Sequence, residues 1–171
     1  MLEVKNLSTY YYPDEGMVKA VEDVSFAVQA GEVLGLVGES GSGKSTVALS
    51  IMRLISAPGK IIAGKVVLDG VDLLGLTEAE MIKVRGKEIS MVFQDPFSSL
   101  NPVFTVGDQI AEAIELHQGV GRKEAWQRAI EMLETVQIKD PAKRIGDYPH
   151  QFSGGMRQRV MISMALACRP K

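Results

Sequence analysis

The sequence has only one cysteine, Cys168, among its 171 residues. A single cysteine excludes an internal disulfide framework, and a chain without disulfides fits a reducing compartment. We interpret Cys168 as a small, buried helical residue, because free cysteine behaves mainly as a small hydrophobic side chain.

Long apolar segments are also lacking. No apolar run approaches the roughly 20 residues that a membrane-spanning helix needs. The longest candidate, residues 160–167, is short and contains Ser163. Residues 1–5 include no basic segment followed by an apolar one, so a signal peptide is not expected. If the protein serves a membrane, we expect it to do so through a partner.

Neither sign of charge is in clear excess. The 19 Lys and Arg residues against 21 Asp and Glu residues leave a net charge of −2. This balance provides no global attraction for nucleic acid or anionic lipid, so any phosphate binding must come from a local site. The length fits one compact domain with a core of its own.

The pattern of apolar and turn residues predicts an α/β core followed by a helical region after about residue 100. Residues 18–28 alternate between apolar and polar, which is typical of an antiparallel strand. The continuous apolar run 33–37 predicts a strand buried on both faces, as in a parallel sheet. Further strands are predicted at 2–12, 61–68 and 89–93, and helices at 45–55, 78–85, 106–117, 122–136 and 154–167.

A glycine-rich motif follows the predicted strand 33–37. Residues 38–45 read Gly-Glu-Ser-Gly-Ser-Gly-Lys-Ser and match G-x-x-x-x-G-K-[ST] at every fixed position, directly before a predicted helix. Glycines allow backbone torsions closed to other residues, so successive N–H groups can point at a phosphate. The helix start adds further N–H groups and a positive dipole end.

The motif predicts a site for ATP with Mg²⁺. Lys44 is expected to reach the β- and γ-phosphates, the Ser45 hydroxyl to ligate Mg²⁺, and Thr46 to contact the α-phosphate. A chance match is disfavoured, because with glycine at about 7% of residues it would arise roughly once in tens of thousands of windows. The predicted nucleotide-binding residues of this loop are Gly38, Ser40, Gly41, Ser42, Gly43, Lys44, Ser45 and Thr46.

A second motif, residues 152–159, reads Phe-Ser-Gly-Gly-Met-Arg-Gln-Arg. Ser153 is a suitable N-cap, and the two glycines expose N–H groups at a positive helix end, so by itself the motif could be simple helix capping. Beside a phosphate loop it resembles the signature motif of ABC-type ATPases, usually Leu-Ser-Gly-Gly-Gln. Phe152 replaces the Leu and Met156 replaces the Gln. The resemblance depends on Ser153, Gly154, Gly155, Gln158 and Arg159.

Two further segments agree with this family. Residues 93–96, Phe-Gln-Asp-Pro, resemble its Q-loop, which implies that Gln94 contacts Mg²⁺ and the attacking water; alone, it would be a polar residue ending a strand. The Tyr10–Tyr12 run lies where the family has an aromatic side chain that stacks on adenine. Its spacing from the preceding strand favours Tyr11, while Tyr10 and Tyr12 could be core or surface residues.

The resemblance covers the entire chain. It implies a P-loop NTPase core of ABC type with an antiparallel β subdomain and a helical subdomain. Residues 1–171 are then one nucleotide-binding domain, incomplete at the C-terminal part of its core sheet. Residues 1–94 are expected to form the β subdomain and P-loop core, and residues 95–168 the Q-loop and the helical subdomain with the signature motif.

Residues 94–102 and 152–160 look most like the ATPase subunits of oligopeptide and dipeptide importers, and nickel importers are close enough to leave the substrate open. The resemblance implies a cytoplasmic protein, peripheral on the inner face of the cell membrane. Its implied partners are a membrane permease docking near residues 96–104 and a second ABC ATPase subunit, identical or different. In that dimer Ser153, Gly154 and Gly155 act in trans on the γ-phosphate; nucleic acid is not an expected partner.

The family's Walker B Asp and catalytic Glu are expected after Lys171, where this sequence stops. Lys44 and Gln94 are therefore the catalytic residues implied here, with Ser45 and Gln94 as Mg²⁺ ligands, and the chain alone is expected to bind ATP but hydrolyse it poorly.

His117 and His150 are interpreted as packing or surface residues. One alternative is a nucleotide-binding fragment without turnover. A DNA-repair ATPase is disfavoured, because the phosphate loop and signature motif are only about a hundred residues apart and no basic stripe is present.

Overall fold

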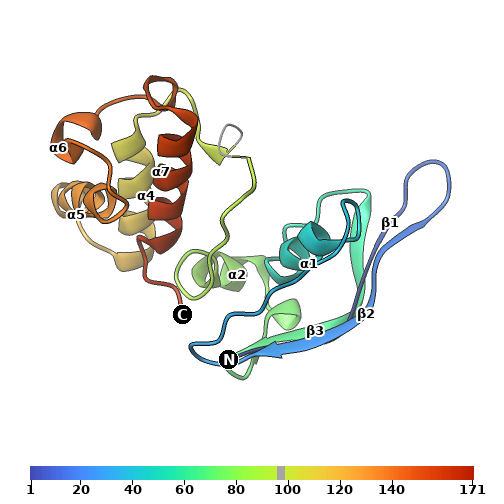
Figure 1. Cartoon of the computed structure of the whole chain (residues 1–171). Helices are drawn as coiled ribbons and strands as arrows, with labels where there is room; N and C mark the ends of the chain where they lie inside the picture. The colour runs from blue at the N-terminus through green and yellow to red at the C-terminus, as the bar shows by residue number, and fades with distance from the viewer. Residues whose placement is uncertain (96–98) are drawn as a thin grey trace. The chain divides into compact units, whose positions relative to one another are not determined.

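The computed structural model describes residues 1–95 and 99–171. The chain divides into two compact units, Met1–Met81 and Ile82–Lys171, which are described separately below. Strands belong to the first unit and most of the helices to the second, as the colours of Figure 1 show. The α-helix α2 (Glu78–Val84) crosses the boundary.

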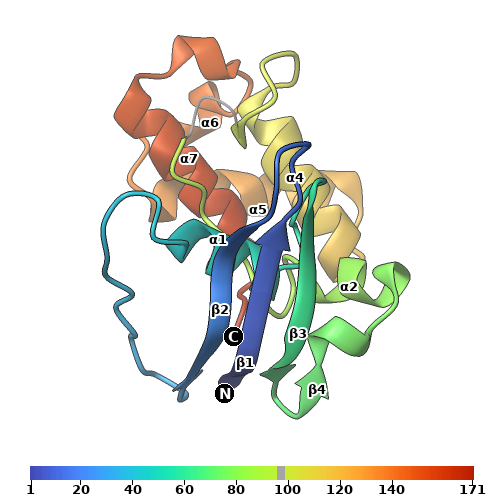
Figure 2. The same cartoon turned by 90° about the vertical axis from the view of Figure 1, so that its right-hand side faces the viewer.

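The first unit is built on an antiparallel sheet with the order β2-β1-β3-β4 (Figure 2). Its strands are β1 (Leu2–Tyr11), β2 (Val18–Val28), β3 (Gly59–Leu68) and the short β4 (Val71–Asp72). Every pairing is antiparallel, which confirms the prediction made from the alternation in β2. In the centre of the sheet, Val4 lies opposite Phe26 of β2 and Val66 of β3.

The helix that follows the phosphate loop, α1 (Lys44–Ile51), packs against this sheet. Its Val47 and Ile51 side chains are buried, as are Leu7 of β1 and Val21 of β2. One buried polar pair joins helix and sheet, since the Thr9 and Ser50 hydroxyl oxygens are 2.7 Å apart. The sheet therefore fixes the helix whose first turn ends the phosphate loop.

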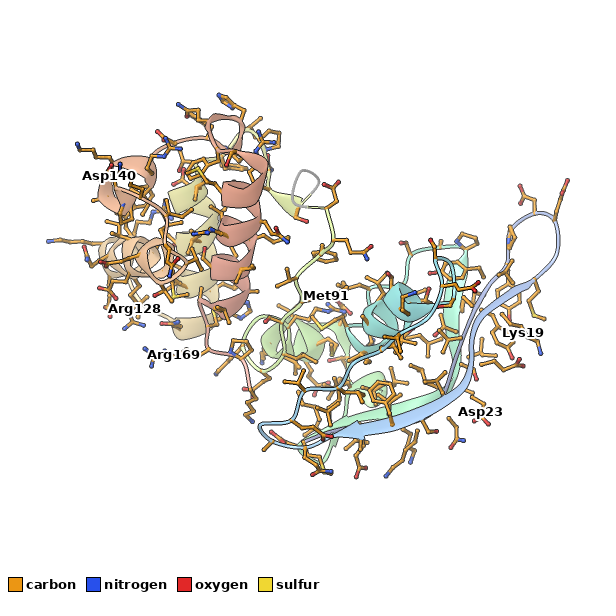
Figure 3. All side chains as sticks on the ribbon, in the orientation of Figure 1. Lys19, Asp23, Met91, Arg128, Asp140 and Arg169 are labelled. Atoms are coloured by element: carbon orange, nitrogen blue, oxygen red, sulfur yellow. The ribbon has the colours of Figure 1, made fainter. Side chains whose placement is uncertain are left out.

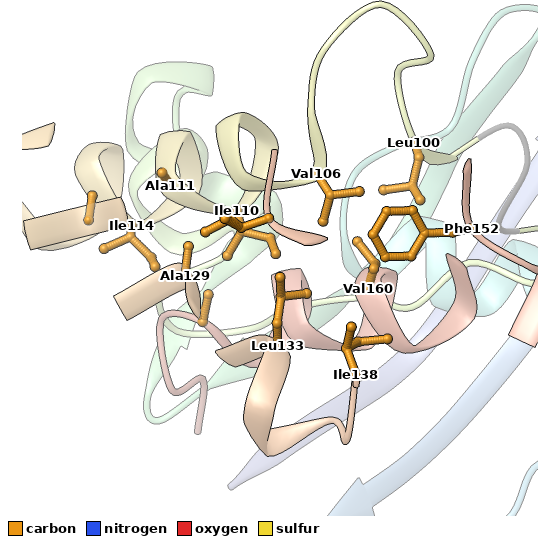
Figure 4. Close-up of a cluster of buried hydrophobic side chains, with 13 residues drawn as sticks. Leu100, Val106, Ile110, Ala111, Ile114, Ala129, Leu133, Ile138, Phe152 and Val160 are labelled. Carbon is orange, nitrogen blue, oxygen red and sulfur yellow. The ribbon is translucent and has the colours of Figure 1, made fainter. Parts of the chain in front are cut away.

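The second unit is helical. Its helices are α4 (Val106–Gln118), α5 (Arg122–Thr135), α6 (Pro141–Arg144) and α7 (Gly154–Leu166), with a 3₁₀ helix η2 (Pro149–Gln151) before α7. Helices α4, α5 and α7 contact one another around a buried apolar cluster (Figure 4). The cluster includes Leu100, Val106, Ile110, Ile114, Leu133, Phe152 and Val160.

The ends of α4 follow from local chemistry. The Thr105 hydroxyl oxygen accepts a hydrogen bond from the Asp108 amide at 3.1 Å, which satisfies a free N–H group of the first turn. The helix ends at Gly119, whose φ of +66° is the left-handed conformation favoured at helix C-termini. Among the described residues, no helix is long and apolar enough to cross a membrane.

Two predicted strands are wrong. Residues 33–37 have no regular secondary structure, and Val33 and Val37 are 95% and 92% exposed. Residues 89–93 contribute only an isolated bridge between Arg85 and Ile89. A strand of a parallel sheet needs hydrogen-bonding neighbours and covered faces, and in the part of the chain that the structure describes no strand of the sheet pairs with either segment. Their apolar composition alone therefore does not produce a strand.

Candidate nucleotide-binding site

The backbone of residues 38–45 forms a glycine-dependent turn into α1. Gly41 and Gly43 have φ angles of +82° and +88°, a region that side chains with a Cβ rarely adopt. Gly43 is the N-cap of α1, and its carbonyl oxygen accepts a hydrogen bond from the Val47 amide at 2.9 Å. The loop therefore leads directly into the helix, whose first turn has N–H groups without a partner inside the helix.

Two other close approaches explain why side chains are excluded from the loop. A Cβ added at Gly38 would lie 2.6 Å from the Ser42 hydroxyl oxygen. A Cβ added at Gly43 would lie 2.2 Å from the carbonyl oxygen of Ala20 in β2. The loop is thus held closely against the sheet.

The Lys44 side chain turns back over the loop. Its ammonium group donates hydrogen bonds to the carbonyl oxygens of Gly38 at 2.8 Å and Glu39 at 2.6 Å, and it lies 3.2 Å from the Ser42 hydroxyl oxygen. A phosphate group offers stronger acceptors than backbone carbonyls, because its oxygens carry charge. The contact of the Lys44 ammonium group with a bound phosphate stays a prediction.

Ser45 and Thr46 lie in the first turn of α1, as the motif predicted. Ser45 is exposed and Thr46 is half-buried. The first turn contains no acidic residue that would compete with an anion for its positive end. Among the described residues no group of three His, Cys, Asp or Glu side chains could hold a metal ion. The role of the Ser45 hydroxyl as a Mg²⁺ ligand stays a prediction.

Tyr11 also belongs to this unit. It ends β1 opposite Gly59, and its ring packs on that glycine, because a Cβ added there would lie 2.6 Å from the Tyr11 Cε1 atom. Tyr10 and Tyr12 have surface partners instead: the Tyr10 hydroxyl donates to Glu22 at 3.0 Å, and the Lys60 ammonium lies 5.9 Å from the Tyr12 ring centre. The stacking role of Tyr11 stays a prediction.

The signature segment opens α7 in the second unit. The Ser153 hydroxyl oxygen accepts a hydrogen bond from the Met156 amide at 3.4 Å, as expected for an N-cap. Gly154 and Gly155 are exposed, and apart from their chain neighbours and the backbone of α7 itself, no described atom lies within 4 Å of a Cβ built on either residue. Local packing therefore does not require glycine at these two positions, which leaves the exposed backbone accessible to a binding partner.

Gln94 is exposed and also lies in the second unit. The structure therefore brings the phosphate loop and Tyr11 together in one unit and places Gln94 and the signature segment in the other. Residues 96–98 of the predicted permease-docking segment lie outside the described residues, while Val103 in the same segment is 70% exposed.

The histidines have the structural roles predicted for them. The His117 ring packs on Gly86, since a Cβ there would lie 2.6 Å from its Nε2 atom. The exposed His150 stacks on Tyr148 with ring centres 5.7 Å apart.

The sequence did not indicate the contact of the loop with Ala20, because this contact involves a backbone carbonyl oxygen, which every residue type has.

Comparison with known proteins places the chain in a family. Residues 21–171 match the family described as ABC transporter. The chain belongs to the ABC transporter family. This confirms the family predicted from the phosphate loop and signature motif. In this ABC chain the matched residues run from within β2 through α1 and β3 to the end of the helical unit.

The curated relatives of this ABC protein include transport proteins from several bacteria. The probable peptide ABC transporter ATP-binding protein y4tR of Sinorhizobium fredii is 52% identical, over 100% of this chain and 51% of the relative. The dipeptide transport ATP-binding protein DppD of Escherichia coli is also 52% identical, over 100% and 52%. The chain spans about half the length of the curated relatives it matches.

A solved structure gives the same assignment of fold. The ATP-binding cassette MJ0796, described as dimeric, in a post-hydrolysis state and bound to ADP and Pi, superposes with a TM-score of 0.87. It is 31% identical, and the match covers 99% of this chain and 71% of that chain. The α/β fold of an ABC ATPase cassette is therefore confirmed.

Proposed function

We propose that this chain is the ATP-binding part of an ABC transporter, coupling ATP binding and hydrolysis to the import of peptides through a membrane permease. The observation that carries the proposal is the loop of residues 38–45, in which the Lys44 ammonium lies over the carbonyl oxygens of Gly38 and Glu39. The names of the relatives, which refer to peptide, dipeptide and oligopeptide transport, support the substrate class. A nickel ion, the substrate of related importers, is the second candidate.

The residues of the loop are suited to bind the triphosphate. Lys44 exchanges its carbonyl contacts for phosphate oxygens, and the amides of the glycine turn donate to the same group. The Ser45 hydroxyl is the proposed ligand of Mg²⁺, which when bound neutralises part of the phosphate charge. Thr46 is proposed to contact the α-phosphate and Tyr11 to stack on adenine. Gly38, Ser40, Gly41, Ser42 and Gly43 complete the cradle.

Hydrolysis is proposed to require a second subunit. Phosphoryl transfer depends mainly on positioning and on electrostatic stabilisation, so an incomplete set of donors gives slow turnover. We assign Gln94 to orienting the attacking water and Ser153, Gly154 and Gly155 to covering the γ-phosphate held by the partner subunit's loop. The unfilled space beside both glycines and the dimeric state named for the solved relative support this arrangement.

The membrane partner is proposed to dock near residues 96–104. Val103 and Phe104, 70% and 52% exposed, provide apolar surface in this segment. The protein would then be peripheral on the inner face of the membrane. The proposed internal division remains residues 1–94 for the β subdomain and loop, and 95–168 for the Q-loop and helical subdomain.

For the 171-residue polypeptide by itself we propose ATP binding with slow turnover, because the donors proposed to come from a second subunit are needed to complete the site. The alternative considered from the sequence, a nucleotide-binding fragment without turnover, is not favoured, because the relatives are named as transport ATP-binding proteins. Hydrolysis assays separate the two, since turnover that rises with protein concentration would favour the dimeric ATPase.

The primary test is the affinity for fluorescent ATP with Mg²⁺. We expect Lys44→Ala to weaken binding about 10- to 100-fold, because a hydrogen bond to a charged group contributes about 1.5–3 kcal/mol. The control is Lys65→Ala, which removes an exposed lysine from β3. If Lys44→Ala binds ATP as the unaltered chain does, the proposed site is wrong.

A second experiment decides between the substrates. It measures the uptake of labelled dipeptide and of Ni²⁺ by a strain lacking the gene.

A further inference from the structure

Two arginines bind the backbone immediately before the signature motif. The Arg144 Nη2 group donates a hydrogen bond to the Gln151 carbonyl oxygen at 3.3 Å. The Arg157 Nε group donates to the Phe152 carbonyl oxygen at 3.0 Å. These two carbonyls belong to the last residues before Ser153, so the entry into α7 is held from two helices, α6 and α7.

The contacts of Arg144 also extend past Ser153. Its guanidinium carbon lies 4.7 Å from the centre of the Phe152 ring, and Nη2 lies 3.8 Å from the Met156 sulfur. Phe152 is only 2% exposed and belongs to the apolar cluster, so this cation–π contact links the arginine to the core of the unit. One side chain therefore contacts residues on both sides of Ser153, Gly154 and Gly155.

Arg144 is held in place in turn. It ends α6, the short helix that begins at Pro141 after Asp140 (Figure 3), and its Nε atom lies 3.3 Å from the Asp147 carboxylate. That Nε atom is buried and has no hydrogen-bond partner among the described residues, so the ion pair with Asp147 compensates for its burial. Loss of the Asp147 charge would leave it uncompensated.

We propose that Arg144 is a positioning residue for the signature turn. By holding Gln151, Phe152 and Met156, it fixes the direction in which the Ser153 hydroxyl and the Gly154 and Gly155 amides face a nucleotide on a second subunit. The inference rests on the proposed function for the identity of that ligand, but the positioning of the turn does not depend on it. Met156, which replaces the glutamine usual in the family, supplies one of the contacts.

The first experiment measures positioning directly, by amide hydrogen exchange in the nucleotide-free chain. The Met156 and Arg157 amides bond to the side chain and the carbonyl of Ser153, so their exchange reports the turn. We expect Arg144→Ala to accelerate exchange of both about tenfold, with helices α4 and α5 unchanged. Arg144→Lys keeps the charge without the planar guanidinium and should be intermediate.

The matched control is Lys143→Ala, which removes the neighbouring exposed cation of α6 and should exchange as the unaltered chain does. Unchanged exchange at Met156 and Arg157 in Arg144→Ala would overturn the proposal. So would equal acceleration throughout α4 and α5, because that pattern is general destabilisation of the unit.

The second experiment measures self-association of the chain with MgATP. Arg144→Ala should bind ATP within twofold of the unaltered chain but associate about tenfold more weakly, and Ser153→Ala is the reference for a signature defect. If the unaltered chain associates and Arg144→Ala associates equally well, the effect of Arg144 in trans is refuted. If the unaltered chain does not associate at all, the proposed dimeric function fails, and the exchange experiment still decides the positioning role.

Discussion

Gly43 and Ala20 approach so closely that only a hydrogen atom fits between the α-carbon of the one and the carbonyl oxygen of the other. A Cβ at Gly43 would lie 2.2 Å from that oxygen. Gly43 closes the phosphate loop and caps α1, whereas Ala20 belongs to β2. The shape of the loop is therefore set partly by the antiparallel sheet, which the motif itself does not include.

Because of this contact, we expect alanine substitution to be more damaging at Gly43 than at Gly41, although the two glycines have similar φ angles. Gly43→Ala should weaken ATP binding at least tenfold and destabilise the chain by about 2 kcal/mol or more, from left-handed strain together with the clash. Gly41→Ala, with open space around it, should cost only about 1–2 kcal/mol from strain. Urea unfolding and ATP titration of both variants provide the comparison. Equal effects would show that the contact with Ala20 is unimportant.

The buried hydroxyl pair between α1 and β1 leads us to expect that removing one of the two hydroxyl groups destabilises the chain more than removing the other. Both Thr9 and Ser50 are fully buried, and the Ser50 hydroxyl also donates to the Thr46 carbonyl oxygen at 2.6 Å. Ser50→Ala removes the hydroxyl that pairs with Thr9 and should cost about 1–3 kcal/mol, whereas Thr9→Val leaves Ser50 bonded and should cost about 1 kcal/mol or less. Free energies of unfolding in urea test the order, and the reverse order would contradict it.

Because of His117, we expect the folded chain to lose stability in acid. Burial, with a smaller contribution from Lys87, lowers the pKa of His117 below its ordinary value. Above pH of about 6.5 the imidazole is neutral in both states; as the pH falls, the unfolded chain takes up the proton first, so unfolding becomes more favourable. Between pH 7.5 and 5.5, His117→Gln should lose less stability than the unaltered chain. An equal loss of stability in His117→Gln and the unaltered chain would contradict the prediction.

Cys168 predicts slow thiol chemistry. Burial raises the pKa of the thiol, an effect that its contact with Gln118 only partly offsets. The thiolate is the reactive form, so iodoacetamide at pH 8 should alkylate the folded chain about tenfold more slowly than the urea-unfolded chain. As the chain has one cysteine, mass spectrometry reads this rate without interference. Equal rates would show that the side chain is freely accessible.

Predictions of helices in the second unit, which are based on local patterns, agreed with the structure. The period of apolar residues located α4, α5 and α7 to within about two residues, a displacement usual at helix ends. Thr105, Gly119 and Ser153 mark helix ends that cap chemistry indicates directly. Both kinds of signal depend on neighbours within a few positions along the chain, so they can be found without tertiary information.

Some residues of the candidate nucleotide-binding site could likewise be predicted from the sequence, and others could not. The loop motif indicated Gly43, Lys44 and Ser45 because phosphate binding requires those residue types at that spacing. It could not indicate the contact with Ala20, which involves only a backbone carbonyl. Nor did it indicate Arg144, because the segments it holds together meet only when α6 and α7 are folded.

The sequence by itself determined the family, the phosphate loop, the signature turn and the helical periods, since each depends on residue types at short, regular spacings. Tertiary structure decided which apolar segments become strands. Val18–Val28 found an antiparallel neighbour in β1, whereas residues 33–37, a continuous apolar run, have no paired strand among the described residues and remain irregular. A strand exists only when a neighbour satisfies its backbone hydrogen bonds, and that neighbour is supplied by the fold and not by the segment.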